Sequence, residues 1–378
     1  MEIYLDNGAT TRVCPEAAEA ALKVMLEDYG NPSSTHRKGR EAKAVLERAR
    51  AQIMAALGAR DGELAFTSGG SESDNWAILE GAEARRRVGR HILSSDAEHD
   101  AVKKTLEAAR QRGWEVTLLP PGADGAVSPE AVREALRPDT ALVSLMLVNN
   151  ETGAITDIPG VRRVMKEAGS RALLHTDAVQ GFLKVPFTAP SLGADLISLS
   201  GHKIHAPKGV GALYLAKGVR LSPLLFGGGQ ENGLRSGTEA LPQIAAFGAA
   251  AEVGRREAAA AQQRMAALRQ RCIDRVLSEA EDAVVIGGGA PHVLCLSLPG
   301  YRSEVLMNYL EAREIYVSKG SACKRGRRSH VLEAMGLPAG VIDGAIRVSL
   351  SRFTTEQEID AFAEALLEAR RTLRKSVR

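Results

Sequence analysis

An apolar run at residues 141–148, ALVSLMLV, sets the strongest limit on the fold of this chain. A continuous apolar strand is typical of a parallel sheet that is buried on both faces. The run leads directly into the polar sequence Asn149-Asn150-Glu151-Thr152-Gly153. Open α/β sheets bind their ligands at the carboxyl ends of their strands. We therefore expect an α/β fold with a mostly parallel sheet flanked by helices, and a site beside these polar residues.

Two more apolar strands are expected at residues 196–199 and 210–215, and the polar, glycine-containing connection between them carries Lys203. An amine held at a strand end between buried elements loses solvation, and His202 and Lys208 lie close to it in the sequence. Both effects favour the neutral, nucleophilic amine that Schiff-base chemistry requires. The alternative is an ordinary solvated lysine in a surface loop.

A Schiff-base lysine that works with pyridoxal 5'-phosphate (PLP) needs a carboxylate for the pyridine nitrogen and a flat group against the ring. Asp177 comes just past the apolar part of the strand expected at residues 172–180, where it could meet a pyridinium or simply cap a helix. His99 lies at the junction of a strand and a helix. It could cap the helix, or it could cover a cofactor and carry protons.

The cofactor's phosphate needs free backbone N–H groups. Residues 63–68 are strand-like, and Ser68-Gly69-Gly70-Ser71-Glu72-Ser73 then leads into a helical pattern. A glycine turn before a helix presents N–H groups and the positive end of the helix dipole to an anion. The turn is neither a Walker loop nor the dinucleotide GxGxxG, so it adds little to a nucleotide-binding hypothesis.

Composition limits the partners. The net charge of +3 over 378 residues is too small for a nucleic-acid surface. No apolar run approaches the ~20 residues of a membrane span, and the N-terminus does not resemble a signal segment. We expect a cytoplasmic protein without nucleic-acid or membrane partners. The four cysteines have no CxxC spacing, which argues against both a disulfide scaffold and a zinc site.

The C-terminal third returns to alternating strand and helix signals after a long helical stretch at residues 241–281. We expect a large domain at residues 15–255 and a small α+β domain formed by residues 1–14 and 256–378. Cys323 lies in the polar segment of the small domain, and the Lys and Arg residues around it would stabilise a thiolate.

These stretches together resemble the bacterial cysteine desulfurases of the NifS and IscS type, which are PLP enzymes of the class-V aminotransferase group with fold type I. The resemblance covers nearly the whole chain. It is carried by motifs that come in the family's order: YLDNGATT, NPSSTH, FTSGGSES, the EH of residues 98–99, VNNETG, HTDAVQ, SGHK, APKGVG, GGGQENGLRSGT, GSAC and RVSLSRFTT.

The resemblance implies a role for each matching residue. By this resemblance, Lys203 forms the covalent link to the cofactor, Asp177 contacts the pyridine nitrogen, Gln180 contacts the ring hydroxyl, and the imidazole of His99 stacks on the ring. The residues that match the phosphate site are Gly70, Ser71, Ser200 and His202, and Thr238 reaches that site from the second subunit of a homodimer. Asn150 and Arg347 match the positions that hold the substrate carboxylate, and Asn150 also matches a position beside the cofactor. Cys323 matches the catalytic cysteine.

Several positions depart from the family pattern. Gly8 stands where alanine is usual, Gly70-Ser71 where Ala-Thr is common, and His205-Ala206 where Tyr-Gly is more usual. The segment after Cys323 is short and strongly basic.

The implied activity is conversion of L-cysteine to L-alanine with a persulfide on Cys323. The sulfur would pass to an acceptor or scaffold protein in iron–sulfur cluster assembly or tRNA thiolation. A PLP aminotransferase or another PLP lyase could use the same pocket but would give Cys323 no task. A selenocysteine lyase would use Cys323 in a similar way. A non-catalytic scaffold is disfavoured because Lys203, Asp177, His99 and Cys323 are all retained.

Overall fold

The computed structural model describes residues 2–319 and 328–375. Its centre is a seven-stranded sheet in the order β2-β8-β7-β6-β5-β3-β4, in which only β8 runs against its neighbours. The strands are β2 (Glu63–Thr67), β3 (His91–Ser95), β4 (Glu115–Leu119), β5 (Thr140–Ser144), β6 (Leu173–Asp177), β7 (Leu196–Ser200) and β8 (Gly211–Leu215). The expected mostly parallel α/β sheet is confirmed.

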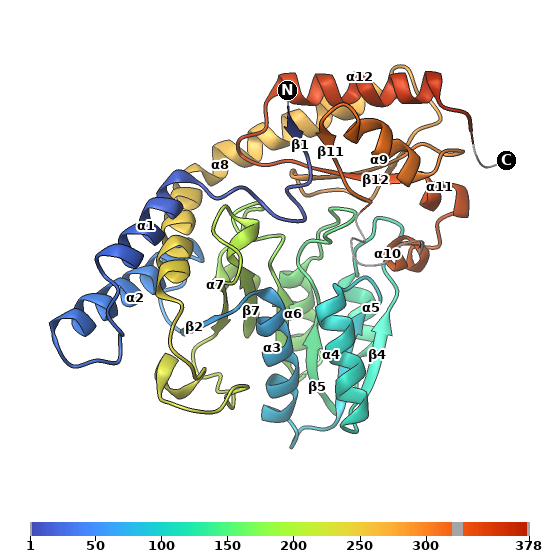
Figure 1. Cartoon of the computed structure of the whole chain (residues 1–378). Helices are drawn as coiled ribbons and strands as arrows, with labels where there is room; N and C mark the ends of the chain where they lie inside the picture. Colours follow the sequence, from blue (N-terminus) through green and yellow to red (C-terminus); the bar gives the residue numbers. More distant parts are fainter. Residues whose placement is uncertain (1, 320–327, 376–378) are drawn as a thin grey trace.

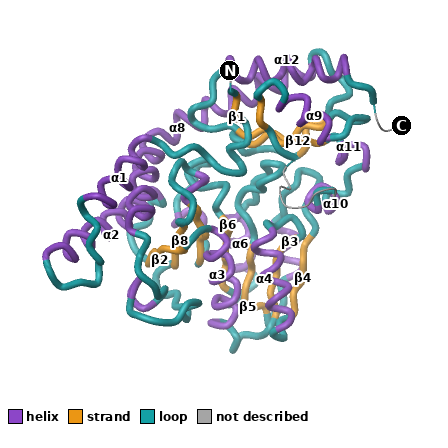
Figure 2. Tube along the Cα trace, in the orientation of Figure 1, coloured by secondary structure: helices purple, strands orange, loops and turns teal. Residues whose placement is uncertain are grey.

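Alternate side chains of each strand enter different cores, which explains why the strands lack polar alternation. On one face Ile92, Leu142 and Leu173 pack against α3 (Gly70–Ala84) and α4 (Asp100–Gln111). On the other face Leu93, Val143 and Leu174 join the larger core with α6 (Ile158–Glu167) and the first part of α8 (Leu241–Leu277). Figure 2 shows α3 and α4 lying across the strands. The remaining helices of this part are α1 (Pro15–Leu26), α2 (Arg37–Ala56), α5 (Pro129–Ala135) and α7 (Ala189–Leu192).

The strand expected at residues 141–148 is formally shorter, because β5 ends at Ser144. The backbone nevertheless stays paired with β6, since Leu145 N donates to His175 O (3.1 Å) and Leu147 N donates to Asp177 O (2.9 Å). This pairing carries Asn149 and Asn150 to the same sheet edge as Asp177.

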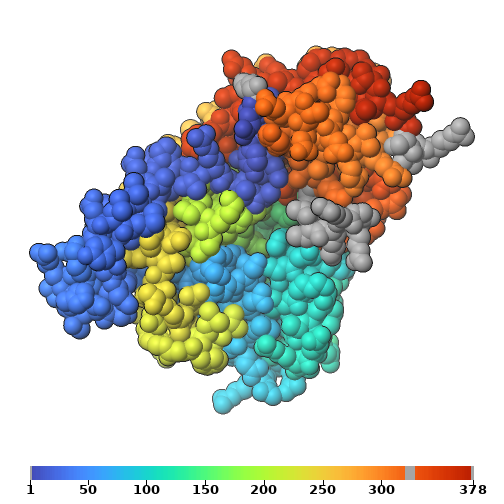
Figure 3. Space-filling view, viewed as in Figure 1, coloured from blue at the N-terminus to red at the C-terminus, as the bar shows by residue number. Residues whose placement is uncertain are grey.

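A third core lies in the C-terminal elements, above the sheet in Figure 1. Here β12-β10-β9 form an antiparallel sheet and β1 pairs with β11. The elements are β1 (Ile3–Tyr4), β9 (Val284–Ile286), β10 (Val293–Ser297), β11 (Ile315–Tyr316), β12 (Ala345–Ser349), α9 (Ser303–Glu311), α10 (His330–Ala334), α11 (Ala339–Asp343) and α12 (Glu356–Thr372). In Figure 3 the dark-blue N-terminal residues lie beside these orange elements.

The helix α8 joins the two parts. Its first turns, including Phe247 and Ala250, are buried in the larger sheet core, whereas Met265, Leu268 and Val276 are buried in the C-terminal core. This arrangement supports the predicted division at residues 15–255 against 1–14 and 256–378, which stays a proposal. None of the helices among the described residues is long and apolar enough to cross a membrane.

Candidate active site

A cavity of about 600 Å³ lies at the carboxyl ends of β6 and β7, between the sheet and the C-terminal elements. Most of the residues singled out in the sequence line it: Gly70, Ser71, His99, Asn150, Asp177, Gln180, Ser200, His202, Lys203 and Arg347. The fold therefore brings together residues that are up to 339 positions apart, since Gly8 lines the same cavity as Arg347. Thr238 is exposed and is not among the lining residues, and Cys323 lies outside the described residues.

Lys203 ends a short 3-10 turn (Gly201–Lys203) directly after β7. Its Nζ donates to Gly8 O and Ala9 O, both at 2.7 Å. Burial and then the nearby Arg347 lower the pKa of Lys203 to about 8, although Asp6 and Asp177 act in the opposite direction. The amine is therefore partly neutral near pH 8.

The reason expected for this low pKa was partly wrong. His202 is itself neutral near pH 7, because burial lowers its pKa to about 4, and Lys208 is exposed to solvent. The cation that matters for Lys203 is Arg347, which is 144 positions away in the sequence and comes from β12. Only the tertiary structure places it there.

Asp177 ends β6 and is 6% exposed. Its Oδ1 accepts a hydrogen bond from Val179 N (2.9 Å) in the turn that follows. Burial raises the pKa of Asp177, while the charges of His99 and Lys203 pull it down. A buried carboxylate of this kind is stabilised by a cation placed against it.

Near Asp177 lie two buried groups that the sequence analysis missed, Asp74 of α3, which also lines the cavity, and His175 of β6. Burial lowers the pKa of His175 to about 3, and its ring nitrogens lie 2.8 Å from Ser144 Oγ and 2.9 Å from Ser198 Oγ. Burial and the charge of Asp177 raise the pKa of Asp74 well above its usual range. Its Oδ1 has no hydrogen-bond partner among the described residues. Asp74 follows Gly70 by one helical turn, and this spacing could have identified it as a cavity residue.

The N-terminus of α3 forms one wall of the cavity through Gly70 and Ser71. Its N-cap residue, Gly69, makes no side-chain capping bond, so the first N–H groups of the helix remain available to an anion. A Cβ on Gly70 would come within 2.8 Å of Val179 Cγ2. The departure to glycine is thus matched to the valine that packs against it.

Of the alternatives considered for His99, helix capping is confirmed, and the role over a cofactor stays a prediction. Its Nδ1 accepts a hydrogen bond from Ala101 N (3.1 Å) and caps α4. The ring also lines the cavity. Since Nδ1 is an acceptor, the proton of the neutral ring is on Nε2.

Arg347 is only 3% exposed and is held from two sides. It donates to Asn150 O and to Asp6 Oδ1, both at 2.8 Å, while its Nε has no hydrogen-bond partner within the part of the chain that the structure describes. A Cβ on Gly8 would lie 3.2 Å from Cζ of Arg347 and 3.0 Å from Ser349 Oγ, so glycine leaves room for the guanidinium. Asp6 is a site residue that the sequence analysis did not identify.

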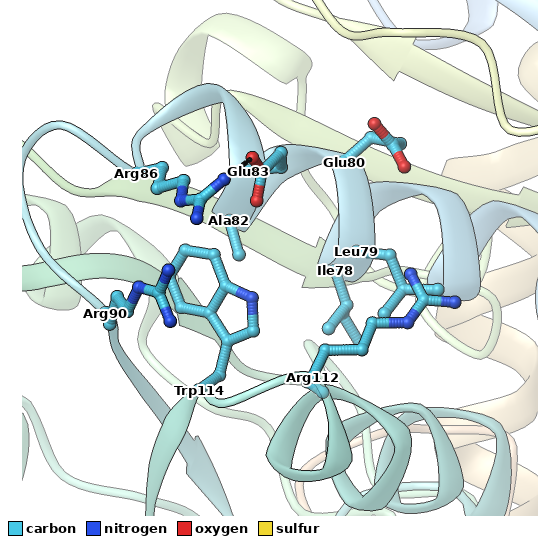
Figure 4. Close-up of a pocket in the computed structure, with 10 residues that line it drawn as sticks. Ile78, Leu79, Glu80, Ala82, Glu83, Arg86, Arg90, Arg112 and Trp114 are labelled. Carbon is cyan, nitrogen blue, oxygen red and sulfur yellow. Dashed lines mark hydrogen bonds and ion pairs between the residues drawn. The ribbon is translucent and has the colours of Figure 1, made fainter.

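The outer surface has another hollow, of about 200 Å³, between α3 and α4 (Figure 4). Trp114 lies among Arg86, Arg90 and Arg112 there, and Arg86 is paired with Glu83 at 3.1 Å. None of the residues singled out in the sequence lines it. The described residues also contain no cluster of three or more His, Cys, Asp or Glu side chains arranged to hold a metal ion.

Comparison with known proteins gives a consistent family. Residues 3–362 match the model of the family described as Aminotransferase class-V. The chain is 41% identical over 379 residues to the cysteine desulfurase IscS of Methanosarcina thermophila, an alignment that covers 98% of this chain and 93% of that protein.

Solved structures agree with this relationship. A NifS-like protein superposes with a TM-score of 0.93 at 38% identity, covering 99% of this chain and 100% of the other. SspA in complex with cysteine superposes with a TM-score of 0.81 at 32% identity, covering 93% and 100%. The resemblance drawn from the motifs and the predicted fold class are both confirmed. The chain belongs to the aminotransferase class-V family and, within it, to the cysteine desulfurases of the IscS and NifS type.

Proposed function

We propose that this protein is a PLP-dependent cysteine desulfurase that converts L-cysteine to L-alanine and leaves a persulfide on Cys323. The observation that carries the proposal is the placement of Lys203, with a pKa lowered to about 8 mainly by burial, in one cavity with Asp177 and the N-terminus of α3. Membership of the cysteine desulfurases and the structure of the related SspA with cysteine support the substrate.

The residues present fit PLP. The uncapped N-terminus of α3, with Ser200 and His202, would hold the phosphate, and Asp177 would face the pyridine nitrogen. Asp177 and Asp74 are buried acidic groups whose pKa values are raised by burial, which suits a site that receives a cation. When bound, PLP supplies an electron sink for a carbanion at the substrate Cα.

The chain's own residues then have distinct tasks. Lys203, as a partly neutral amine, takes the Cα proton and returns it. Asp177 would keep a proton on the pyridine nitrogen, and His99 could offer its Nε2–H to the ring side of the cavity that it lines. Arg347 offers its guanidinium to the substrate carboxylate, with Asn150 beside it.

Cys323 is assigned from its sequence position. The other three cysteines are buried, and burial raises the pKa values of Cys272 and Cys295 to about 12, so these two are neutral thiols. The thiolate of Cys323 would form a bond to the substrate sulfur while the Cβ–S bond breaks. The electron pair stays with Cβ, which takes a proton to give alanine, and the sulfur remains on Cys323 as a persulfide.

We infer that the persulfide is passed to a sulfur-acceptor or scaffold protein in iron–sulfur cluster assembly or tRNA thiolation. The name IscS of the related protein and the basic residues around Cys323 support an acceptor protein over a small acceptor. Cys14, Cys272 and Cys295 are buried and form no disulfide with one another, which suits the cytoplasmic location that we propose.

Product analysis tests the activity. Purified protein is incubated with L-cysteine and a thiol reductant, and equal amounts of alanine and sulfide are expected. Pyruvate and ammonia, or a transferred amino group, would indicate a lyase or an aminotransferase instead. Parallel assays with L-selenocysteine measure the preference between the two substrates.

The role of Cys323 is tested by Cys323→Ser, with Cys272→Ala as the matched control. We expect Cys323→Ser to bind PLP and to change its visible spectrum when L-cysteine is added. It should release almost no sulfide and carry no persulfide by intact mass, whereas Cys272→Ala should do both. Native sulfide release by Cys323→Ser would disprove the covalent mechanism.

A further inference from the structure

Lys184 is a buried amine that the proposed reaction does not use. It is 8% exposed and follows Gln180 by four residues in a succession of turns after β6. In these turns Phe182 N donates to Ala178 O (2.8 Å) and Lys184 N donates to Gly181 O (3.0 Å). The turns bring the Lys184 side chain onto the side of Gln180, where its Nζ donates to Gln180 Oε1 (3.2 Å).

Lys184 gains little compensation for its burial. The charged groups that act on it are the cations Lys203 and Arg347, and its own charge acts on His202, His205 and His292. It also lines a small cavity of about 40 Å³ with Lys203, which has room for only a few water molecules. The carboxylate in the lining of this cavity, Glu257, is paired with Arg352 at 3.2 Å. Burial, followed by Lys203 and Arg347, lowers the pKa of Lys184 well below its usual range. A buried amine in this setting needs a structural or functional reason.

The hydrogen bonds of Gln180 suggest that reason. Its Nε2 donates to Gly8 O (2.8 Å), the same carbonyl that accepts from Lys203 Nζ (2.7 Å). Gly8 O can only accept, which selects one orientation of the Gln180 amide, and the hydrogen bond from Lys184 Nζ to Oε1 holds the amide in that orientation. A flipped amide would place Oε1 against Gly8 O. In the selected orientation the NH₂ group keeps a second hydrogen for the cavity that Gln180 lines.

We propose that Lys184 is a positioning residue that holds the amide of Gln180 so that an N–H group faces the ring oxygen of the bound cofactor. This inference rests on the proposed function, in which Gln180 contacts that oxygen. Lys184 itself is not among the residues that line the large cavity. It acts through the side chain of Gln180. That side chain donates to Gly8 O, which also accepts a hydrogen bond from Lys203.

The test is a pH titration of the visible absorbance of the resting holoprotein, without substrate. An N–H donor stabilises negative charge on the ring oxygen, so losing it makes that oxygen a better proton acceptor. We expect the midpoint of this pH titration to rise by about 0.5–1 pH unit in Lys184→Met. A shift of this size corresponds to the free energy of about one hydrogen bond. Exposed Lys208→Met, which also removes a lysine near His202, should leave the midpoint unchanged.

A double-mutant cycle separates positioning from a direct effect of charge. In a Gln180→Ala background, Lys184→Met should no longer move the midpoint. An equal shift in both backgrounds, or no shift in the native background, would overturn the proposal. If Lys184→Met does not fold, Lys184→Leu takes its place in the same cycle. The proposed function requires that the native protein show a visible absorbance band and that Lys203→Ala remove this band. If either is not observed, the proposed function is overturned, and this inference with it.

Discussion

The reactivity expected of Lys203 comes mainly from its surroundings and only secondarily from neighbouring charges. Burial lowers the pKa of Lys203 to about 8, and Arg347 adds to this shift. The value in the unfolded chain is near 10.5, so the unfolded chain binds more protons between these two values. Holding this amine in the fold therefore costs stability below pH 8, and the cost fades as the pH rises towards 10.5.

We predict that Lys203 of the cofactor-free protein reacts with a small amine-reactive ester about ten times faster at pH 9 than at pH 7, with little further rise. The rate is measured by mass spectrometry of the labelled peptide. Exposed Lys104 is the internal control: Glu107 raises its pKa, so its labelling should still be rising at pH 10. A Lys203 profile that follows Lys104 would contradict the lowered pKa.

Asp177→Asn is predicted to keep the fold but to lose turnover by roughly 100-fold or more, the scale seen when a positioned electrostatic partner is removed. The amide oxygen can still accept from Val179 N. Since burial raises the pKa of Asp177, its charge costs folding free energy above the unfolded pKa, and asparagine removes that cost. The cofactor-free variant should therefore melt no lower than the native protein. Near-native alanine production would show that another group performs this task.

At the scale of an element, the N-terminus of α3 depends on close packing with the turn after β6. The Val179 side chain occupies the space that a Cβ at Gly70 would need, because that Cβ would lie 2.8 Å from Val179 Cγ2. Overpacking of this kind typically costs about 1–3 kcal/mol. Here it would displace the N–H groups that we expect to hold phosphate.

We predict that Gly70→Ala weakens PLP binding about tenfold, and that adding Val179→Ala restores most of it. Affinity is measured by absorbance titration of the cofactor-free protein. Gly340→Ala in α11 is the matched control, because a Cβ there meets no atom within 4 Å. If the double variant binds no better than Gly70→Ala, the contact with Val179 is not the cause.

At the scale of the whole molecule, the glycine-rich loop before α8 points to a second subunit. Thr238 is exposed and does not line the cavity of its own chain. Phe226 is 84% exposed in the same loop, whose region is yellow in Figure 3. An exposed aromatic side chain beside a residue matched to the phosphate site suits a homodimer with shared active sites.

Co-expression of a Lys203→Ala chain with a Thr238→Val chain tests this proposal. If Thr238 completes the partner's site, each heterodimer contains one site with both native residues and should show about half of the native activity, well above either variant alone. If Thr238 acts within its own chain, the heterodimer should show only half of the Thr238→Val activity. Sedimentation of the native protein provides the oligomeric state.

Much of the fold and of the candidate site could be predicted because the signals are local. The apolar strands, the glycine turn before α3 and the long helix α8 appear at the expected positions, with ends differing by a few residues. Periodicity and turn residues act over a few positions, and the ordered motifs identified the family. Lys203, Asp177 and His99 stood out because each lies at or just after the end of a strand and therefore reaches the same edge of the sheet.

What only the tertiary structure decided are the contacts between segments far apart in the chain. Asp6 pairs with Arg347, and the Gly8 carbonyl accepts from both Lys203 and Gln180. Asp74 lies close enough to Asp177 for the two charges to interact. No pattern within one segment predicts such pairs. They determine which buried groups are charged, because the pKa of each group depends on its desolvation and on the neighbours that packing places around it. The sequence by itself thus determined which residues reach the site, and packing determined the protonation and orientation of each one.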